Sequence, residues 1–223
     1  MEFPDFSKPT VMCDVIVVAD TKKLYCNKAI LSIWSPVFET MFKSNFKEKD
    51  SNEVQLPDKS YDDIYELLQV IYPPNKPITI VNVERMLELA DEYQMIELNK
   101  RCRTFLMQQR GTLEILLLAQ RYQFDDVVKR CADHLKHTIN SNILATDSKI
   151  KEVNLETMNA LLVARIKHLE TLLDSFKKKV SGACEKFREI KALPGKKLII
   201  KFKHQIFLFF FITVYILYNV KNK

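Results

Sequence analysis

The fold of this protein is set by residues 13–38, which read CDVIVVADTKKLYCNKAILSIWSPVF. The β-branched run in residues 13–18 predicts a strand, and residues 19–22 predict a turn into a returning strand at 23–26. Beyond that strand the apolar side chains recur every three or four residues, which predicts helix. Ser35-Pro36 interrupts this pattern, and proline suits the first turn of a new helix. The stretch therefore predicts a β-hairpin followed by two short helices.

Short elements continue after this stretch. A charged loop at 43–52 leads to residues 53–56, which predict a third strand. Ser60, with an acidic residue three positions later, is typical of a capped helix start, and Pro73-Pro74 would end that helix. The sequence therefore predicts the α+β class, with a small three-stranded sheet flanked by helices.

An internal repeat follows the third predicted helix. Residues 86–106, moved along the chain by 29 positions, align with residues 115–135 and are identical at nine of 21 positions. Each copy predicts a helical hairpin with Tyr-Gln at its corner. Neither hairpin can bury its apolar face alone, so we expect the two copies to stack, with Leu89, Leu118, Tyr93 and Tyr122 in equivalent and largely buried positions.

Composition argues against most kinds of catalysis. The chain has three glycines, none in an arrangement that cradles phosphate. Its five cysteines are widely spaced and include no CxxC pair, which favours reduced thiols packed in a core. The four histidines supply no zinc set and no catalytic dyad. We therefore expect no catalytic residue, no metal and no cofactor, and a protein that is not an enzyme.

The net charge of +6 is unevenly distributed. Residues 1–175 contain 22 basic and 26 acidic side chains, whereas residues 176–223 carry a net charge of +10. A mildly acidic main domain does not predict a nucleic-acid-binding face. The acidic, proline-bearing N-terminus is unlike a signal peptide, so we expect a cytoplasmic or nuclear protein.

The C-terminal part has two sections. An amphipathic helical segment is predicted at 150–192, with apolar residues at spacings of three and four: Leu155, Met158, Leu162, Ile166, Leu169, Leu173 and Phe176. This segment has two interpretations, docking against its own domain or an intermolecular coiled coil.

Residues 196–223 form a basic and hydrophobic tail after Leu193-Pro194-Gly195. Ile206 to Tyr218 is a run of thirteen apolar or near-apolar residues, shorter than the roughly 20 that a spanning helix needs. Three interpretations stay open: a short membrane anchor, a folded helix, or a stretch that is not genuine coding sequence. We expect the tail to contribute nothing to the fold.

The ordered series of motifs resembles a BTB (POZ) domain. The matching segments are Asp14-Val15, Asn27 to Leu31, Ser35-Pro36-Val37-Phe38, Leu67 to Tyr72, Asn82-Val83, Leu87 to Asp91 and Cys102 to Leu106. The resemblance implies a BTB/POZ (Skp1-like) fold over residues 13–107. It also implies a 3-box or BACK-like helical hairpin at 108–140, of the kind that follows the BTB domain in cullin adaptors.

The same resemblance implies partner-binding residues. Phe46 and Glu48 match a hydrophobic-x-Glu motif that contacts cullin-3 in family members, and Tyr72 matches a second cullin contact, although it equally suits a core. Asp14 and Lys28 match positions that face each other in a charged pocket near the dimer interface of some relatives.

The implied function is that of an adaptor that docks on cullin-3 and recruits a target for ubiquitylation. Two departures from the family are expected: a missing or very short N-terminal dimerisation helix, and no MATH, Kelch or zinc-finger region in the sequence. The alternatives are a BTB oligomerisation or transcription-associated scaffold without cullin binding, and a tail-anchored membrane adaptor.

Overall fold

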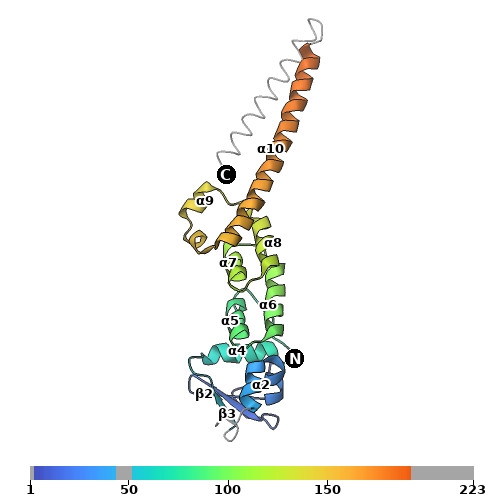
Figure 1. Ribbon diagram of the computed structural model, residues 1–223. Helices are drawn as coiled ribbons and strands as arrows, with labels where there is room; N and C mark the ends of the chain where they lie inside the picture. The colour runs from blue at the N-terminus through green and yellow to red at the C-terminus, as the bar shows by residue number, and fades with distance from the viewer. Residues whose placement is uncertain (1–2, 44–51, 192–223) are drawn as a thin grey trace. The chain divides into compact units, whose positions relative to one another are not determined.

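A computed structural model describes residues 3–43 and 52–191 of the chain. The sheet consists of β1 (Val15–Ala19), β2 (Lys22–Cys26) and β3 (Glu53–Gln55), in the order β2-β1-β3 (Figure 1). β1 is antiparallel to β2 and parallel to β3. Every residue of β1 except Ile16 is buried, as suits the central strand of the sheet. The predicted α+β class and three-stranded sheet are confirmed.

The turn between β1 and β2 depends on two residues with positive φ. Asp20 has φ 48° and Thr21 has φ 64°, the pair of left-handed residues that gives a two-residue hairpin the twist of its strands. The Asp20 carboxylate also accepts the backbone N–H of Tyr61 at 2.9 Å. This turn therefore fixes the start of the next long helix as well as the hairpin register.

The helices that cover the sheet are α1 (Lys28–Trp34), α2 (Pro36–Lys43) and α4 (Tyr61–Ile71). Pro36 opens α2, as predicted, and Ser35 between the helices is fully buried. Its hydroxyl donates to the Tyr93 carbonyl at 2.7 Å and accepts the Phe38 N–H at 3.1 Å. The predicted cap of α4 is wrong in one respect. Ser60 occupies the cap position but its side chain makes no capping bond, and Asp20 binds the first N–H of the helix instead.

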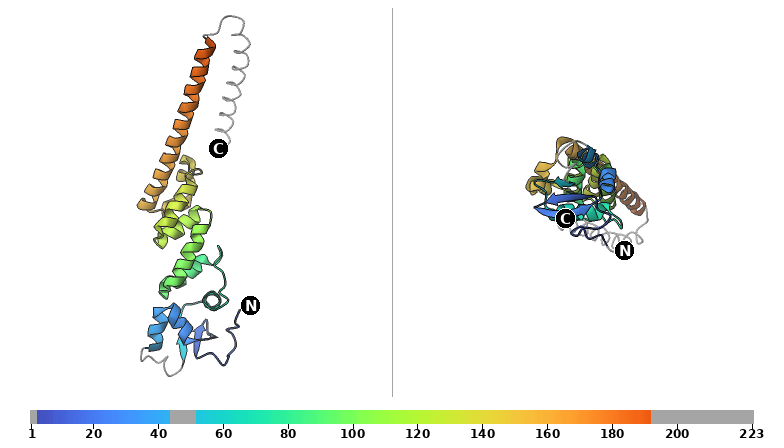
Figure 2. Two further views of the ribbon diagram at one scale, coloured as in Figure 1. Left: turned by 90° about the vertical axis from the view of Figure 1, so that its right-hand side faces the viewer. Right: turned by 90° about the horizontal axis from the view of Figure 1, so that it is seen from below.

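The repeat forms two helical hairpins, α5 (Val83–Glu92) with α6 (Ile96–Gln108) and α7 (Leu113–Arg121) with α8 (Asp125–Leu135). They follow one another along the unit, and α6 contacts α8 (Figures 1 and 2). The corners match: Gln94 and Gln123 both have positive φ, and the next N–H bonds back to Ala90 and Ala119 at 2.7 and 2.8 Å. This is the helix-ending arrangement in which a left-handed residue lets two free carbonyls find donors. The predicted pair of hairpins is confirmed.

Burial of the repeat follows the prediction with one exception. Leu89, Leu118 and Tyr93 are buried, but Tyr122 is only half-buried. The two tyrosines differ because Tyr93 stacks on Phe38, with ring centroids 4.8 Å apart, whereas Tyr122 lies beside Phe124 on its own corner. Equal positions in a repeat therefore give unequal burial when only one copy packs on the sheet domain.

The chain continues through α9 (Ser141–Thr146) and the 3₁₀ helix η1 (Ser148–Glu152) into α10 (Leu155–Lys191). It divides into two compact units, Met1–Arg165 and Ile166–Lys223. In the first unit, Thr157 and Leu161 of α10 are buried, while Leu155 is exposed. Leu155 belongs to the predicted apolar series but lies outside the buried face at the start of α10, which carries Thr157 and Leu161.

Among the described residues of the first unit, one hydrophobic core runs from the sheet to Leu161. Cys26, Cys102 and Cys131 belong to it as predicted, whereas the prediction is wrong for the half-buried Cys13 and the exposed Cys184. Burial raises the pKa of each of the three core thiols, to about 12 for Cys102 and about 11 for Cys131. These thiols are therefore protonated packing groups rather than nucleophiles.

Candidate partner-binding surface

Tyr72 lies where α4 ends, and its side chain is buried. Its hydroxyl accepts the backbone N–H of Asn27 at 2.8 Å, immediately before α1 begins. Burial raises the pKa of this phenol, so the hydroxyl stays neutral at physiological pH. Tyr72 thus joins the end of α4 to the start of α1 from within the core.

The segment before β1 covers Tyr72. The Phe6 ring is buried and meets Tyr72 edge to face, with centroids 4.9 Å apart and planes at 75°, and it meets Tyr65 in the same way at 5.8 Å. The Phe6 carbonyl accepts the N–H of Tyr25 on β2 at 2.8 Å, so this segment runs beside the sheet (Figure 2). A partner could reach the Tyr72 ring only after the Phe6 segment had moved.

Asp14 and Lys28, the predicted charged pocket, meet in a different way from facing side chains. The exposed Asp14 carboxylate accepts the backbone N–H of Lys28 at 2.7 Å, at the first residue of α1. A carboxylate at this position satisfies a free N–H and complements the helix dipole. The Lys28 ammonium donates to Asn52 Oδ1 at 2.7 Å instead of to Asp14.

Phe46 and Glu48 lie outside the described residues, between the end of α2 at Lys43 and Asn52. Asn52 follows that segment directly, and through Lys28 it is tied to the N-terminus of α1. The N-terminus of α1 is therefore the point at which Tyr72, Asp14 and Asn52 converge.

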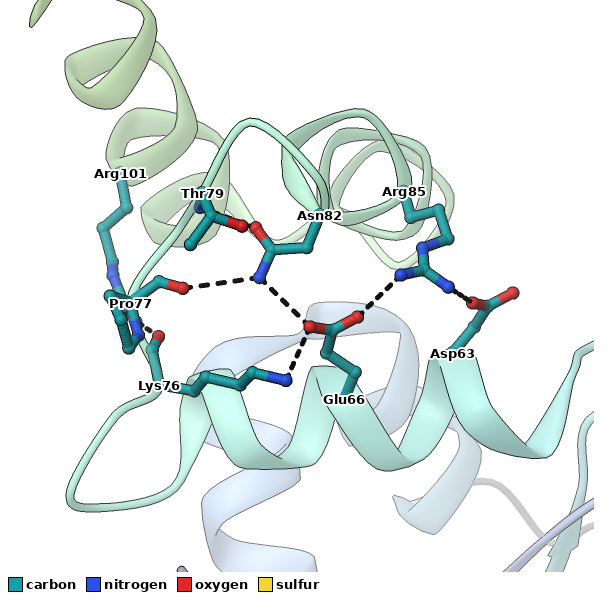
Figure 3. A network of polar contacts seen from close by, with 8 residues as sticks. All are labelled: Asp63, Glu66, Lys76, Pro77, Thr79, Asn82, Arg85 and Arg101. Atoms are coloured by element: carbon teal, nitrogen blue, oxygen red, sulfur yellow. Dashed lines mark hydrogen bonds and ion pairs between the residues drawn. The ribbon is translucent and has the colours of Figure 1, made fainter.

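A polar network on α4 was not predicted from sequence. Figure 3 shows Glu66 between Lys76, Asn82 and Arg85, with ion pairs of 2.7 Å to Lys76 and 2.9 Å to Arg85. Arg85 also pairs with Asp63 at 2.6 Å, one turn before Glu66 on the same helix face. In the sequence, the signal for this network was the three-residue spacing of Asp63 and Glu66, which puts both carboxylates on one helix face. Charged residues on a helix ordinarily indicate a solvated face, so this spacing alone does not predict a network.

The buried Asn82 is the centre of this network. Its side-chain oxygen accepts the Thr79 N–H at 2.7 Å, and its amide donates to Glu66 at 3.2 Å and to the Pro77 carbonyl at 3.3 Å (Figure 3). All these bonds hold the loop between α4 and α5. The network therefore organises the scaffold next to the α1–α4 junction.

Charge and burial act in opposite directions on Glu66. Burial alone would raise its pKa, but hydrogen bonds from Lys76 and Asn82 and the charge of Arg85 outweigh that effect and lower the pKa. Glu66 is therefore ionised at neutral pH.

The linker between the two hairpins packs on α8 through Gly111 and His134. The Gly111 N–H donates to His134 Nδ1 at 2.7 Å, and a Cβ on Gly111 would lie 2.7 Å from the Cα of Cys131. His134 thus accepts a backbone hydrogen bond here. Within residues 3–43 and 52–191, no three His, Cys, Asp or Glu side chains are grouped so that they could hold a metal ion.

Comparison with known protein families identifies the domain that these elements form. Residues 3–110 match the BTB/POZ domain model. Residues 3–110 are a BTB/POZ domain. The matched region begins ten residues earlier than the predicted domain start at 13, and it takes in the Phe6 segment that packs beside β2.

Relatives of this BTB domain belong to the BTB-MATH and BTB-Kelch groups. The chain is 37% identical to BTB and MATH domain-containing protein 38 of Caenorhabditis elegans over 155 residues, which are 69% of this chain and 40% of that protein. It is 30% identical to BTB and MATH domain-containing protein 36 of the same organism over 71% of this chain and 50% of that protein. It is 29% identical to human Kelch-like protein 7 over 73% of this chain and 26% of that protein. The chain thus spans between a quarter and a half of these relatives.

Among solved structures, the BTB (Tramtrack and Bric a brac) domain of human Gigaxonin is similar, with 22% identity and a TM-score of 0.37 over 42% of this chain and 77% of that one. BTB domains are interaction modules without enzymatic activity. None of the helices in the described residues combines the length and apolarity needed to cross a bilayer, and Ile206 to Tyr218 lies outside those residues.

Proposed function

We propose that this BTB protein is an adaptor that binds cullin-3 and presents a target for ubiquitylation. Phe46 would fill an apolar pocket of the cullin, and Glu48 would make a charged hydrogen bond beside it. The observation that carries the proposal is the convergence at the N-terminus of α1. There Tyr72 binds Asn27, and Lys28 binds the Asn52 that follows the Phe46–Glu48 segment.

The second hairpin would extend the same docking surface. We propose residues 108–140 as the 3-box or BACK-like part, a range that contains α7 and α8. Arg121 of α7 pairs with Glu84 of α5 at 3.0 Å, and Arg103 of α6 pairs with Asp126 of α8 at 3.0 Å. These ion pairs and the shared core support a continuous BTB-plus-hairpin surface.

Titration of the full chain against the cullin-3 N-terminal region tests the proposal. We expect Phe46→Ala to weaken binding about thirtyfold, which corresponds to roughly 2 kcal/mol for a buried interface anchor. Phe3→Ala is the matched control, because Phe3 is an exposed phenylalanine that is not among the proposed contacts. No binding by the unmodified chain at tens of micromolar would sink the adaptor proposal, and equal binding by Phe46→Ala would sink the site.

A second candidate function is a self-associating scaffold that binds no cullin. The observation in its favour is the burial of Tyr72 beneath Phe6, which leaves that side chain as a core residue. Light scattering that finds an oligomer, together with no heat of binding to cullin-3, would favour the scaffold over the adaptor.

A further inference from the structure

An exposed apolar stripe follows α10 after Arg165. Its described members are each 45–53% exposed, and we call them the α10 seam: Ile166, Leu169, Leu173, Phe176 and Val180. The spacing alternates strictly between three and four residues, and Ala183, Phe187 and Ile190 continue it in the sequence. The whole series spans about three and a half heptads, which is the length that sustains a coiled coil.

The 3.5-residue period of the seam indicates what would cover it. A helix that packs on a globular core needs a broad apolar face with a period near 3.6 residues. A strict heptad keeps a narrow seam turned toward a second helix as the two supercoil. The seam side chains are half-exposed along α10, so the matching surface has to come from another helix.

We propose that the partner helix is α10 of a second copy of this chain, parallel and in register. In the heptad, Ile166, Leu173 and Val180 take the a positions, while Leu169 and Phe176 take the d positions. β-branched residues at a with leucine at d favour a parallel two-stranded coiled coil. Two of the four a residues of the series are β-branched, and Leu169 is the first d residue. This surface is distinct from the proposed cullin-binding surface, so either proposal can stand without the other.

The residues that flank the seam are compatible with parallel self-pairing. In that arrangement a g residue faces the following e residue of the partner. Leu172 would face Lys177 of the second copy, and Lys179 would face Cys184 of the second copy. In both pairs the apolar stem of a lysine would lie on a less polar side chain. Like charges would meet only at positions 186 and 191, at the end of the helix. An antiparallel pairing of the whole seam would bring like lysines together at its middle, where residues 177 and 179 lie.

Disulfide trapping in the full chain tests both the partner and its direction. Ala183 occupies a d position, so two copies would bring their Cβ atoms together across the seam of a parallel pair. In a Cys184→Ser background we expect Ala183→Cys to give a disulfide-linked dimer under mild oxidation. Lys178→Cys in the same background is the control, because position 178 is on the outer face and should not cross-link.

Variants of the seam separate this contact from any other dimer interface. Adding Leu173→Glu and Phe176→Glu to the trapping background should lower the cross-linked fraction at least tenfold. Thr171→Glu, which adds the same charge on the outer face, should leave that fraction unchanged, and circular dichroism checks that α10 stays helical in each variant. Cross-linking that ignores the seam substitutions would overturn the proposal. A dimer in which Ala183→Cys never cross-links would overturn the parallel register. A chain that stays monomeric at every concentration, with α10 protected from hydrogen exchange, would overturn self-pairing and assign the seam to this chain's own tail.

Discussion

The hydroxyl of Tyr72 accepts the backbone N–H of Asn27 at 2.8 Å, across 45 positions of sequence. Asn27 is the cap residue of α1, and its own side chain makes no capping bond to the helix. Tyr72 at the end of α4 and Asp14 before β1 therefore satisfy two consecutive N–H groups at the start of α1. This junction couples the hairpin, α1 and α4.

Replacing Tyr72 with phenylalanine should destabilise the fold by about 1–3 kcal/mol, because the half-buried Asn27 N–H loses its acceptor while the ring stays in place. Urea unfolding measures the change. Tyr61→Phe is the control, since no hydrogen bond joins the Tyr61 hydroxyl to the described residues, and it should cost little. Equal stability of the two variants would contradict the assignment.

The Phe6 segment should contribute to stability although it precedes the sheet. Phe6→Ala removes a buried ring that contacts Tyr65 and Tyr72, and we expect a loss of about 3 kcal/mol. Phe3→Ala removes an exposed ring and should change stability by less than about 0.5 kcal/mol. If both variants melt at the temperature of the unmodified chain, the segment does not pack as described.

Glu66 should make the fold sensitive to mild acid. Because its folded pKa is lowered from the ordinary value of 4.5, its contribution is present above that pH and is lost as the pH falls through the folded pKa. In urea unfolding measured from pH 7 to pH 3, the urea concentration at the midpoint should therefore decrease once the pH is below about 4.5.

The substitution Glu66→Gln should lower the free energy of unfolding at pH 7 by about 1–2 kcal/mol, because the ion pairs to Lys76 and Arg85 are lost. It should also reduce the loss of stability below about pH 4.5. Glu97→Gln is the control, since among residues 3–43 and 52–191 the one ion pair of Glu97 is an exposed pair with Lys100 on its own helix. If Glu66→Gln loses as much stability in acid as the unmodified chain, other carboxylates cause the acid sensitivity.

Replacing each of the two described glycines with alanine should change stability in opposite directions. Gly111→Ala should destabilise the chain by about 1–3 kcal/mol, because the new Cβ would lie 2.7 Å from the Cα of Cys131 and the linker before α7 would have to move away from α8. Gly182→Ala meets nothing within 4 Å in the middle of α10 and should increase helix stability by about 0.5–1 kcal/mol. Thermal melts followed by circular dichroism measure both, and the same sign in the two variants would contradict the packing at Gly111.

The sequence by itself determined the local elements and their order. The β-branched run before Asp20, the break at Ser35-Pro36 and the repeated Tyr-Gln corners each act through a few neighbouring residues, so their signals are readable along the chain. Burial of Cys26, Cys102 and Cys131 was expected because widely spaced free cysteines usually pack in a core, but the same expectation is wrong for the exposed Cys184.

Only the tertiary structure decided how those elements satisfy one another's polar groups. Asp20 replaces Ser60 as the cap of α4, Asp14 binds a backbone N–H instead of the Lys28 ammonium, and Asn82 is buried among Glu66 and loop carbonyls. Hydrogen-bond partners that lie tens of residues apart become neighbours only when the sheet and helices are assembled, and several side chains compete for each N–H. Likewise, the apolar spacing of α10 was visible in sequence, but the burial of Leu161 and the exposure of Leu155 depend on which face of the helix meets the core.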